Sequence, residues 1–268
     1  MPSISVWIRP VLLIAATLVA FVGASGCSSD GAPPRYAPAA DTTSWTSTGA
    51  PVIERLETLD FAVMDSAFAA LPRLPLTRHT RTDIFTPDDS LRGRLRQTWA
   101  HRPDAAPELL DEERSGTVPD RDLWGLAPRA DASALPQNVV RDAYPDTPSF
   151  LEARNQPAYH YGIRRDTLDS QIPVDRIEVV ARDTDDGRNV PIPYARVDLL
   201  PGTSTVVSTY LVRAERALLY SEDSVFHIAL QARPDGTWLP RDLRFRTRLT
   251  VPLREAESVQ VATTLIPD

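Results

Sequence analysis

The sequence predicts a mainly β domain of the α+β class, an antiparallel sheet preceded by one amphipathic helix. From residue 76 onward, apolar and polar residues alternate with period two in most segments, and turn residues separate these segments. The segment 53–71 instead carries apolar residues at spacings of three and four. Hydrophobic residues make up 42% of the 268 residues, which is enough to build an apolar core.

The N-terminus predicts a cleaved signal peptide, residues 1–26. After Arg9, residues 11–22 run without a charge as VLLIAATLVAFV. A helix needs about 20 apolar residues to cross a bilayer, so this run is too short to span one. Its length is typical of the apolar region of a secretory signal peptide, which the mature protein lacks.

The sole cysteine, Cys27, follows the small residues 24–26 directly. This segment resembles the lipobox of bacterial lipoproteins, although Ala24 stands where the usual leucine would be. The resemblance implies that Cys27 carries a lipid anchor and is the first mature residue. Acyl chains contribute about 0.8 kcal/mol per buried CH₂, so two or three of them hold a protein firmly at a membrane. The alternative is an ordinary signal peptide that precedes a free buried thiol.

The resemblance to lipoproteins also implies a location in the cell envelope. Ser28, rather than an aspartate, follows the cysteine, which by the sorting rule for such lipoproteins favours the outer membrane, facing the periplasm. Residues 27–50 are rich in Ser, Thr, Ala and Pro and have no apolar period, so we expect a disordered tether. Trp45 is its one bulky side chain, either docked on the domain or a stray aromatic.

A single β-rich domain is expected over residues 51–268. Pro51 suits the first position of an amphipathic helix that Pro72 ends. The period then changes to two, and residues 76–85 and 90–99 flank a turn at residues 86–89, which predicts a β-hairpin with one solvated face.

Residues 101–157 lose the alternation and contain eight prolines. A structureless loop of this length is unusual in a compact domain, so we expect short strands or a helix within it. Residues 107–114 are the candidate helix.

Alternation returns after residue 157 and predicts the remaining strands at 158–166, 176–183, 195–200, 205–213, 217–220, 225–232, 237–253 and 258–266. In the clearest of them, Arg244, Arg246 and Arg248 alternate with apolar residues. This arginine row either faces solvent with neighbouring acids or binds an anionic headgroup. Eight to ten strands joined by short turns indicate a mainly antiparallel sheet.

Composition and motifs exclude several classes of function. The formal charge of −7 argues against a nucleic-acid-binding protein, because phosphate binding needs clustered positive charge. The four histidines have no metal-ligand spacing, and the acids at 183–186 lack the register of a calcium loop, so we expect neither a metal nor a cofactor. No G-x-S-x-G elbow is present, so we name no catalytic residue and expect no enzyme.

The order of elements and two segments carry a further resemblance. These segments are TRHTRTDIFTPDDSLRGRLRQTW, after the helix, and YSEDSVFHIALQARPDGTWLPRDLRFRTRL, near the end. They resemble the lipoprotein-carrier and lipoprotein-sorting family (LolA- and LolB-like proteins). The resemblance implies a curved, incomplete β-barrel covered by helices, which encloses an apolar cavity. It implies a non-enzymatic, monomeric protein that binds an acyl chain such as palmitate, a lipid or a lipoprotein.

Seven large side chains are the candidates for lining the concave face of that cavity: Leu95, Trp99, Tyr159, Tyr161, Tyr210, Phe245 and Leu249. The same residues would fill a dry, solid core equally well. Two other functions stay open. The first is a structural envelope lipoprotein that contacts a partner through its sheet edges or residues 101–157. The second is an envelope hydrolase with a nucleophile, a base and an oxyanion site in one pocket.

Overall fold

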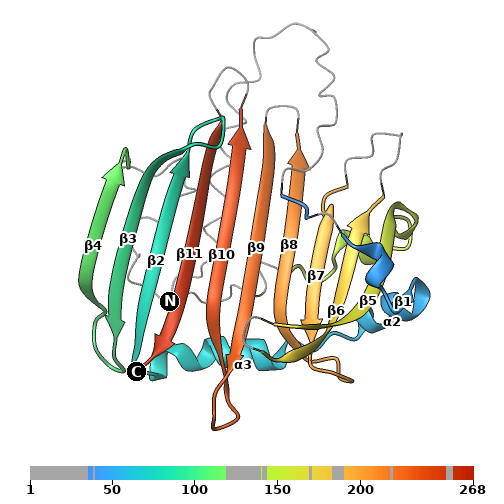
Figure 1. Cartoon of the computed structure of the whole chain (residues 1–268), viewed down its shortest axis with the longest axis horizontal. Helices are drawn as coiled ribbons and strands as arrows, with labels where there is room; N and C mark the ends of the chain where they lie inside the picture. Colours follow the sequence, from blue (N-terminus) through green and yellow to red (C-terminus); the bar gives the residue numbers. More distant parts are fainter. Residues whose placement is uncertain are drawn as a thin grey trace, which may run out of the picture.

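The computed structural model describes residues 36–38, 40–118, 140, 144–168, 171–182, 190–217, 220–251 and 256–268. Within these ranges, one eleven-stranded sheet is flanked by short helices (Figure 1). The helices are η3 (Thr42–Ser44), α2 (Ala50–Glu57), α3 (Ala62–Ala70), η4 (Leu71–Arg73), η5 (Ser149–Leu151) and η6 (Gln156–Ala158). The strands are β1 (Ser47–Thr48), β2 (Leu76–Phe85), β3 (Leu91–His101), β4 (Glu108–Gly116), β5 (Tyr159–Thr167), β6 (Pro173–Ala181), β7 (Tyr194–Leu199), β8 (Val206–Arg216), β9 (Ser221–Ala232), β10 (Trp238–Thr250) and β11 (Glu257–Pro267).

The strands follow the order β1-β5-β6-β7-β8-β9-β10-β11-β2-β3-β4, and every neighbouring pair is antiparallel. The last strand, β11, lies between β10 and β2, so the end of the chain joins the early hairpin to the later meander (Figure 1). The sheet is curved and open, with β4 at one edge and β1 at the other. The predicted fold class, a mainly β curved antiparallel sheet, is confirmed.

The helix predicted over 51–71 is in fact two helices, α2 and α3. At Asp60 the chain turns extended and pairs with the β7–β8 turn: its N–H donates to the carbonyl of Ser204, and its carbonyl accepts from the N–H of Val206, both at 2.9 Å. The Asp60 carboxylate then accepts the backbone N–H of Ala62 at the start of α3. The spacing of apolar residues continues across this break, which is why periodicity alone does not show it.

The predicted candidate helix at 107–114 is wrong, because these residues lie in the edge strand β4. Its acidic side chains pair across to β3, with Glu113 accepting from Arg96 and Glu112 accepting from Gln97. Every residue of β4 is exposed, as expected for an edge strand protected by charge. The adjacent pair Leu109 and Leu110 cannot form the apolar face that a packed helix needs.

The hairpin of β2 and β3 and most later strands match the predicted segments. The short strand predicted at 217–220 lies only partly within the described residues, of which Ala217 and Tyr220 lie between β8 and β9, where the N–H of Ala217 donates to the carbonyl of Tyr220. The arginine row of β10 lies beside acids, since Arg246 and Arg248 both approach Asp89, at 3.2 and 3.5 Å.

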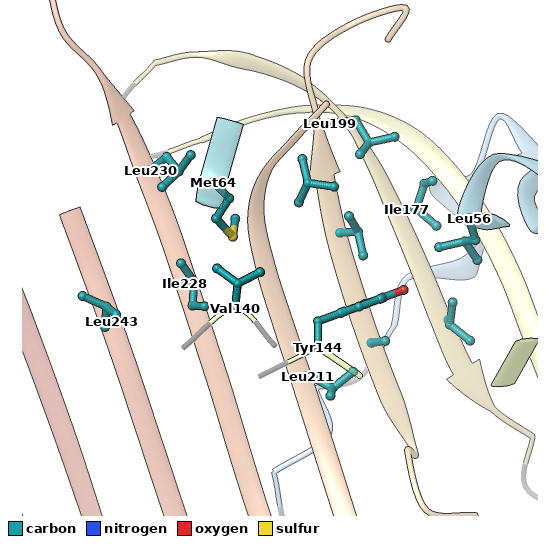
Figure 2. Packing of buried hydrophobic residues seen from close by; sticks show 14 of the residues in the cluster. Leu56, Met64, Val140, Tyr144, Ile177, Leu199, Leu211, Ile228, Leu230 and Leu243 are labelled. Atoms are coloured by element: carbon teal, nitrogen blue, oxygen red, sulfur yellow. The ribbon is translucent and has the colours of Figure 1, made fainter. Parts of the chain in front are cut away.

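The inner face of the sheet is the one against which α2 and α3 pack, and it holds the main apolar core. Figure 2 shows Met64 of α3 close to Leu230, and Leu56 of α2 close to Ile177. Met64 and Ile177 are fully buried. This inner face carries the odd-numbered residues of β5, β6 and β7 and the even-numbered residues of β9, as the cross-strand register requires.

The outer face is crossed by a strap, which we define as residues 36–38 and 40–46. Tyr36 lies 4.5 Å from the Arg246 guanidinium, while Ala37 and Ala40 pack on a second buried cluster built on Tyr194. Trp45 ends the strap and donates from Nε1 to Glu178 at 3.1 Å. The segment predicted as a tether, 27–50, therefore lies on the domain over its last residues, and Trp45 is docked.

The predicted signal peptide 1–26, Cys27 and the acidic turn at 183–187 lie outside the described residues. In the part of the chain that the structure describes, none of the helices has both the length and the apolar character needed to cross a bilayer.

Candidate functional site

The inner face divides into two parts. Over β5 to β10 it is packed under α2, α3 and η5, and Leu76, Ile84, Val259 and Leu265 on β2 and β11 are also buried, whereas five other large apolar side chains on β10, β11 and β3 are half-buried. We call this second part the inner strip and define it by Leu95, Trp99, Phe245, Leu249 and Val261. Four of its five members are residues predicted from the sequence to line a cavity, and they come from two strands that are three positions apart in the sheet.

One register row links the two sides of the inner strip. Leu95 pairs with Thr82, Thr82 with Val261, and Val261 with Phe245. Three strand spacings of about 4.8 Å place Leu95 about 14 Å from Phe245. The ring of Phe245 packs on Phe226 of β9 with centroids 4.9 Å apart, which ties the strip to the covered core.

Polar residues lie at both ends of the inner strip. At one end Glu222 of β9 is mostly buried, and burial is the main cause that raises the pKa of its carboxyl. Thr247 of β10 lies near it, with its hydroxyl 3.5 Å from the carboxylate. At the other end Arg78 of β2 stacks over the indole of Trp99, 5.6 Å from the ring centroid.

A hollow of about 240 Å³ lies at the Arg78 end of the sheet. Leu265 and Pro267 line it, and these two residues of β11 pair in register with Arg78 and Leu76 of β2. The other lining residues are Gln231, Ala232, Arg233, Pro234, Leu239, Pro240, Arg241 and Asp268.

Tyr159 and Tyr161 lie in the covered part of the inner face, away from the strip. Both are buried, at 1% and 5% exposure, within a continuous series of aromatic rings that includes Phe150, Tyr144 and Phe61. The Tyr161 hydroxyl donates to the carbonyl of Phe150 at 2.6 Å, and burial raises the pKa of Tyr161 to about 12. These two tyrosines therefore fill a packed core in this structure.

Tyr210 lies on the outer face, opposite the other six candidates. It packs against Tyr194 and His227, and its hydroxyl lies 3.4 Å from the carbonyl of Tyr36 in the strap. The register explains this: Tyr210 pairs with His227, and the inner position beside it belongs to Leu211. A sequence period of two cannot say which of two adjacent large residues faces inward.

Arg78 and Glu222 are not among the residues predicted from the sequence. Period two places Arg78 on the same face as Leu76 and Ile84, and this signal was available in the sequence. Within the described ranges, no three His, Cys, Asp or Glu side chains gather in a way that could hold a metal ion.

Comparison with known proteins gives structural neighbours only. No family model matches the chain, and no curated protein matches it. A LolA-superfamily protein from Nitrosomonas europaea is similar over 83% of this chain and 94% of its own, with 10% identity and a TM-score of 0.22. An outer membrane lipoprotein-sorting protein domain from Vibrio parahaemolyticus covers 77% of this chain and 92% of its own, with 12% identity and a TM-score of 0.23.

A DUF1329 family protein from Desulfovibrio piger is similar over 82% of this chain and 94% of its own, with 10% identity and a TM-score of 0.24. Two of these three neighbours carry the family names that the sequence resemblance suggested.

Proposed function

We propose that this protein is a non-enzymatic, lipid-anchored lipoprotein of the cell envelope that binds an acyl chain, as part of a lipid or lipoprotein, on the inner strip. The observation that carries the proposal is the inner strip itself. Leu95, Trp99, Phe245 and Leu249 lie half-buried on one face of the sheet, on the strands β3 and β10. Side chains of this kind gain by further burial, at about 25 cal/mol per Å² of apolar surface.

The energetics of an acyl chain suit this surface. Each buried methylene contributes about 0.8 kcal/mol, so ten of them contribute about 8 kcal/mol, which corresponds to micromolar affinity. Such binding needs few polar contacts along the chain.

The first test is uptake of lipid by the chain from residue 27 with Cys27→Ser, prepared without detergent. Native mass spectrometry should show copurified lipid, and a fluorescent fatty acid should bind with micromolar affinity. A homogeneous protein mass together with no fatty-acid uptake would refute the proposal.

Substitutions separate the inner strip from the rest of the surface. Leu95→Gln and Leu249→Gln keep the size of each side chain but remove apolar surface from the strip, and each should weaken fatty-acid binding about tenfold. Ile266→Gln is the matched control, because Ile266 is 48% exposed and lies on the outer face of β11. Equal binding by all three variants would place the ligand elsewhere.

The lipid anchor is tested separately. Cells that express the full chain and receive an alkyne analogue of palmitate should label the protein, and Cys27→Ser should abolish the label. We expect the labelled protein in the outer-membrane fraction, as Ser28 suggests. Labelling that persists in the Cys27→Ser variant would contradict an anchor at this residue.

A second candidate function is an interaction lipoprotein without a ligand, and the exposed edge strand β4 favours it. All nine residues of β4 are exposed, and Leu109 and Leu110 are 42% and 54% exposed. A photo-crosslinking residue at position 110 that captures one stoichiometric envelope partner, in protein that takes up no lipid, would favour this function over acyl-chain binding.

A further inference from the structure

Three nitrogen-bearing side chains form a cluster on the inner face of β2 and β3, at the end where Arg78 of β2 pairs with Leu265 of β11. Arg78 pairs in register with Trp99, and the adjacent inner pair is Leu76 and His101. Arg78, Trp99, His101 and the apolar Leu76 are therefore neighbours on one face of β2 and β3. The Arg78 guanidinium lies 5.6 Å from the centroid of the Trp99 indole, and its positive charge helps to lower the pKa of His101.

Two of the three side chains are buried, and Trp99 is half-buried. Arg78 is 4% exposed and His101 is 5% exposed. Burial lowers the pKa of Arg78 to about 10, which leaves the guanidinium charged at neutral pH. Burial and the nearby Arg78 charge lower the pKa of His101, so its imidazole is neutral and can present an N–H at Nε2.

Two nitrogen atoms of this cluster have unmet hydrogen-bonding capacity. Nε1 of Trp99 and Nε2 of His101 are buried, and neither has a hydrogen-bond partner among the described residues. Buried polar atoms in folded proteins nearly always have a partner, so these two nitrogens each have the capacity to bind a further group. An indole N–H can only donate, so the group beside Trp99 must supply an acceptor.

The chemistry of the cluster fits an oxyanion. Arg78, Trp99 and neutral His101 together offer a guanidinium, an indole N–H and an imidazole N–H. A carboxylate has two oxygens with several acceptor positions and one negative charge, which matches one guanidinium. A phosphate monoester carries up to two charges and needs more positive charge than these described residues supply.

The surroundings of the cluster fit an acyl chain attached to that oxyanion. Trp99 belongs both to the cluster and to the inner strip, and Leu95 follows on the same face of β3. The hollow of about 240 Å³ adjoins the cluster through Leu265, the β11 partner of Arg78. A headgroup bound at Arg78 therefore places the start of its acyl chain at one end of the inner strip.

We propose that Arg78, Trp99 and His101 bind the carboxylate of a long-chain fatty acid whose acyl chain lies along the inner strip. The inference rests on the proposed function for the chain itself and adds the chemical class of the headgroup. It depends on the two nitrogens of Trp99 and His101 and on the position of Arg78 beside them.

The experiment compares palmitate with hexadecanol, which has the same chain and no charge. The protein is the chain from residue 27 with Cys27→Ser, which keeps every residue that the structure describes. Isothermal titration should give at least tenfold tighter binding of palmitate. Arg78→Met and Trp99→Phe each remove donors while nearly keeping shape, and each should reduce the preference for palmitate over hexadecanol to less than threefold.

The matched control is Arg81→Met, since Arg81 is an exposed arginine on the outer face of the same strand. This variant should keep the full preference for palmitate. Trp99→Phe removes only the indole N–H and one ring, so it remains informative where Arg78→Met lowers stability.

The outcomes are distinguishable. Equal binding of palmitate and hexadecanol, or a preference that survives both substitutions, overturns the carboxylate site and leaves acyl-chain binding intact. A tenfold preference for lysophosphatidate over palmitate also overturns it, in favour of a phosphate site. Binding of none of these lipids overturns the proposed function and the carboxylate site together.

Discussion

Asp198 on the outer face is fully buried, and two arginines satisfy it. Arg176 donates from Nε at 2.7 Å, and Nε of Arg196 lies 3.5 Å away. Burial by itself would lower the pKa of Arg176, but its hydrogen bond to Asp198 and the charges of Asp198 and Asp166 raise that pKa. The carboxylates of Asp198 and Asp166 and the Arg176 guanidinium therefore stabilise one another in their charged forms.

Asp198→Asn should lower the free energy of unfolding by about 3 kcal/mol, because it removes the buried carboxylate and leaves Asp166 as the remaining acid paired with Arg176. Glu113→Gln, which removes the exposed pair with Arg96, should change it by less than about 1 kcal/mol. Urea denaturation of both variants measures the difference, and similar losses would show that burial of the Asp198 pair contributes little.

His227 lies on the outer face near the strap, with its ring 5.9 Å from that of Tyr210. Burial, followed by the charges of Arg196 and Arg244, lowers its pKa from 6.5 to about 4, although Asp198 and Asp242 act in the opposite direction. Because the folded state disfavours the charged imidazole, His227 contributes its full stabilising effect above pH 6.5 and loses it as the pH falls towards 4.

The stability of the native chain should therefore fall by about 2–3 kcal/mol more than that of His227→Gln between pH 7 and pH 4, at about 1.4 kcal/mol per pKa unit. His79→Gln is the control, since His79 is exposed on the outer face of β2. Guanidinium titrations at several pH values measure this. Parallel pH curves for the native chain and His227→Gln would contradict a buried neutral imidazole.

At the scale of single residues, the sequence shows which side chains are large or apolar, but it does not show which of them lie on the inner face of the sheet. Leu95, Trp99, Phe245 and Leu249 lie on the inner face, and Tyr210 lies on the outer face. The reason is that residues 210 and 211 are both large and apolar, so alternation gives no preference. The buried Arg78 was missed because an arginine in a strand usually faces solvent.

Among the elements, the strap depends on a glycine in β5. A Cβ on Gly162 would lie 1.8 Å from the Trp45 ring, so only glycine allows the indole to lie flat on the strand. Trp45 then hydrogen-bonds Glu178, and the N–H of Thr46 donates to the carbonyl of Ile163 at 2.8 Å.

Gly162→Val should displace Trp45 and release this end of the strap from β5. The tryptophan emission should shift to longer wavelength, because the displaced indole meets water. The same substitution in a Trp45→Phe background should produce no shift. An unchanged spectrum for Gly162→Val in the native background would show that Trp45 does not depend on this contact.

A strand can be predicted from the sequence when its apolar and polar residues alternate over many positions. The strands β10 and β11 alternate over many residues and were predicted closely, as was the hairpin of β2 and β3. The division into α2 and α3 was not predicted, because Asp60 leaves the helical conformation to pair with residues 204 and 206, which are far away in sequence. The strand β4 has charged residues on both faces and so shows no alternation.

For the whole molecule, β11 is the element that holds the two parts of the sheet together. It pairs with β10 along one side and with β2 along the other. β10 directly precedes β11 in the chain, but β2 lies far from it in sequence, which is why no local pattern predicts the β11–β2 pairing. Thr263 of β11 pairs with Leu243 and Thr80, so it lies inside a continuous ladder.

Thr263→Pro should lower stability on the order of 3 kcal/mol, because proline removes a ladder hydrogen bond and its ring disrupts a central strand. For a chain of this size, the expected fall in Tm is about 6–12 °C. Leu110→Pro is the control, since Leu110 falls in the register shift of the exposed edge strand β4. Calorimetry that finds both variants equally stable would contradict the central role of β11.

If the chain is anchored as proposed, the strap also limits how far the domain can move from the membrane. With Cys27 as the proposed anchor, only nine residue steps separate it from Tyr36, which is already held on the outer face by Arg246. At no more than about 3.5 Å per residue, the segment from Cys27 to Tyr36 can extend to about 30 Å, whereas an undocked segment from Cys27 to Pro51 would extend to about 80 Å. The docked strap thus keeps the outer face close to its own membrane, and its release would add about 50 Å of reach.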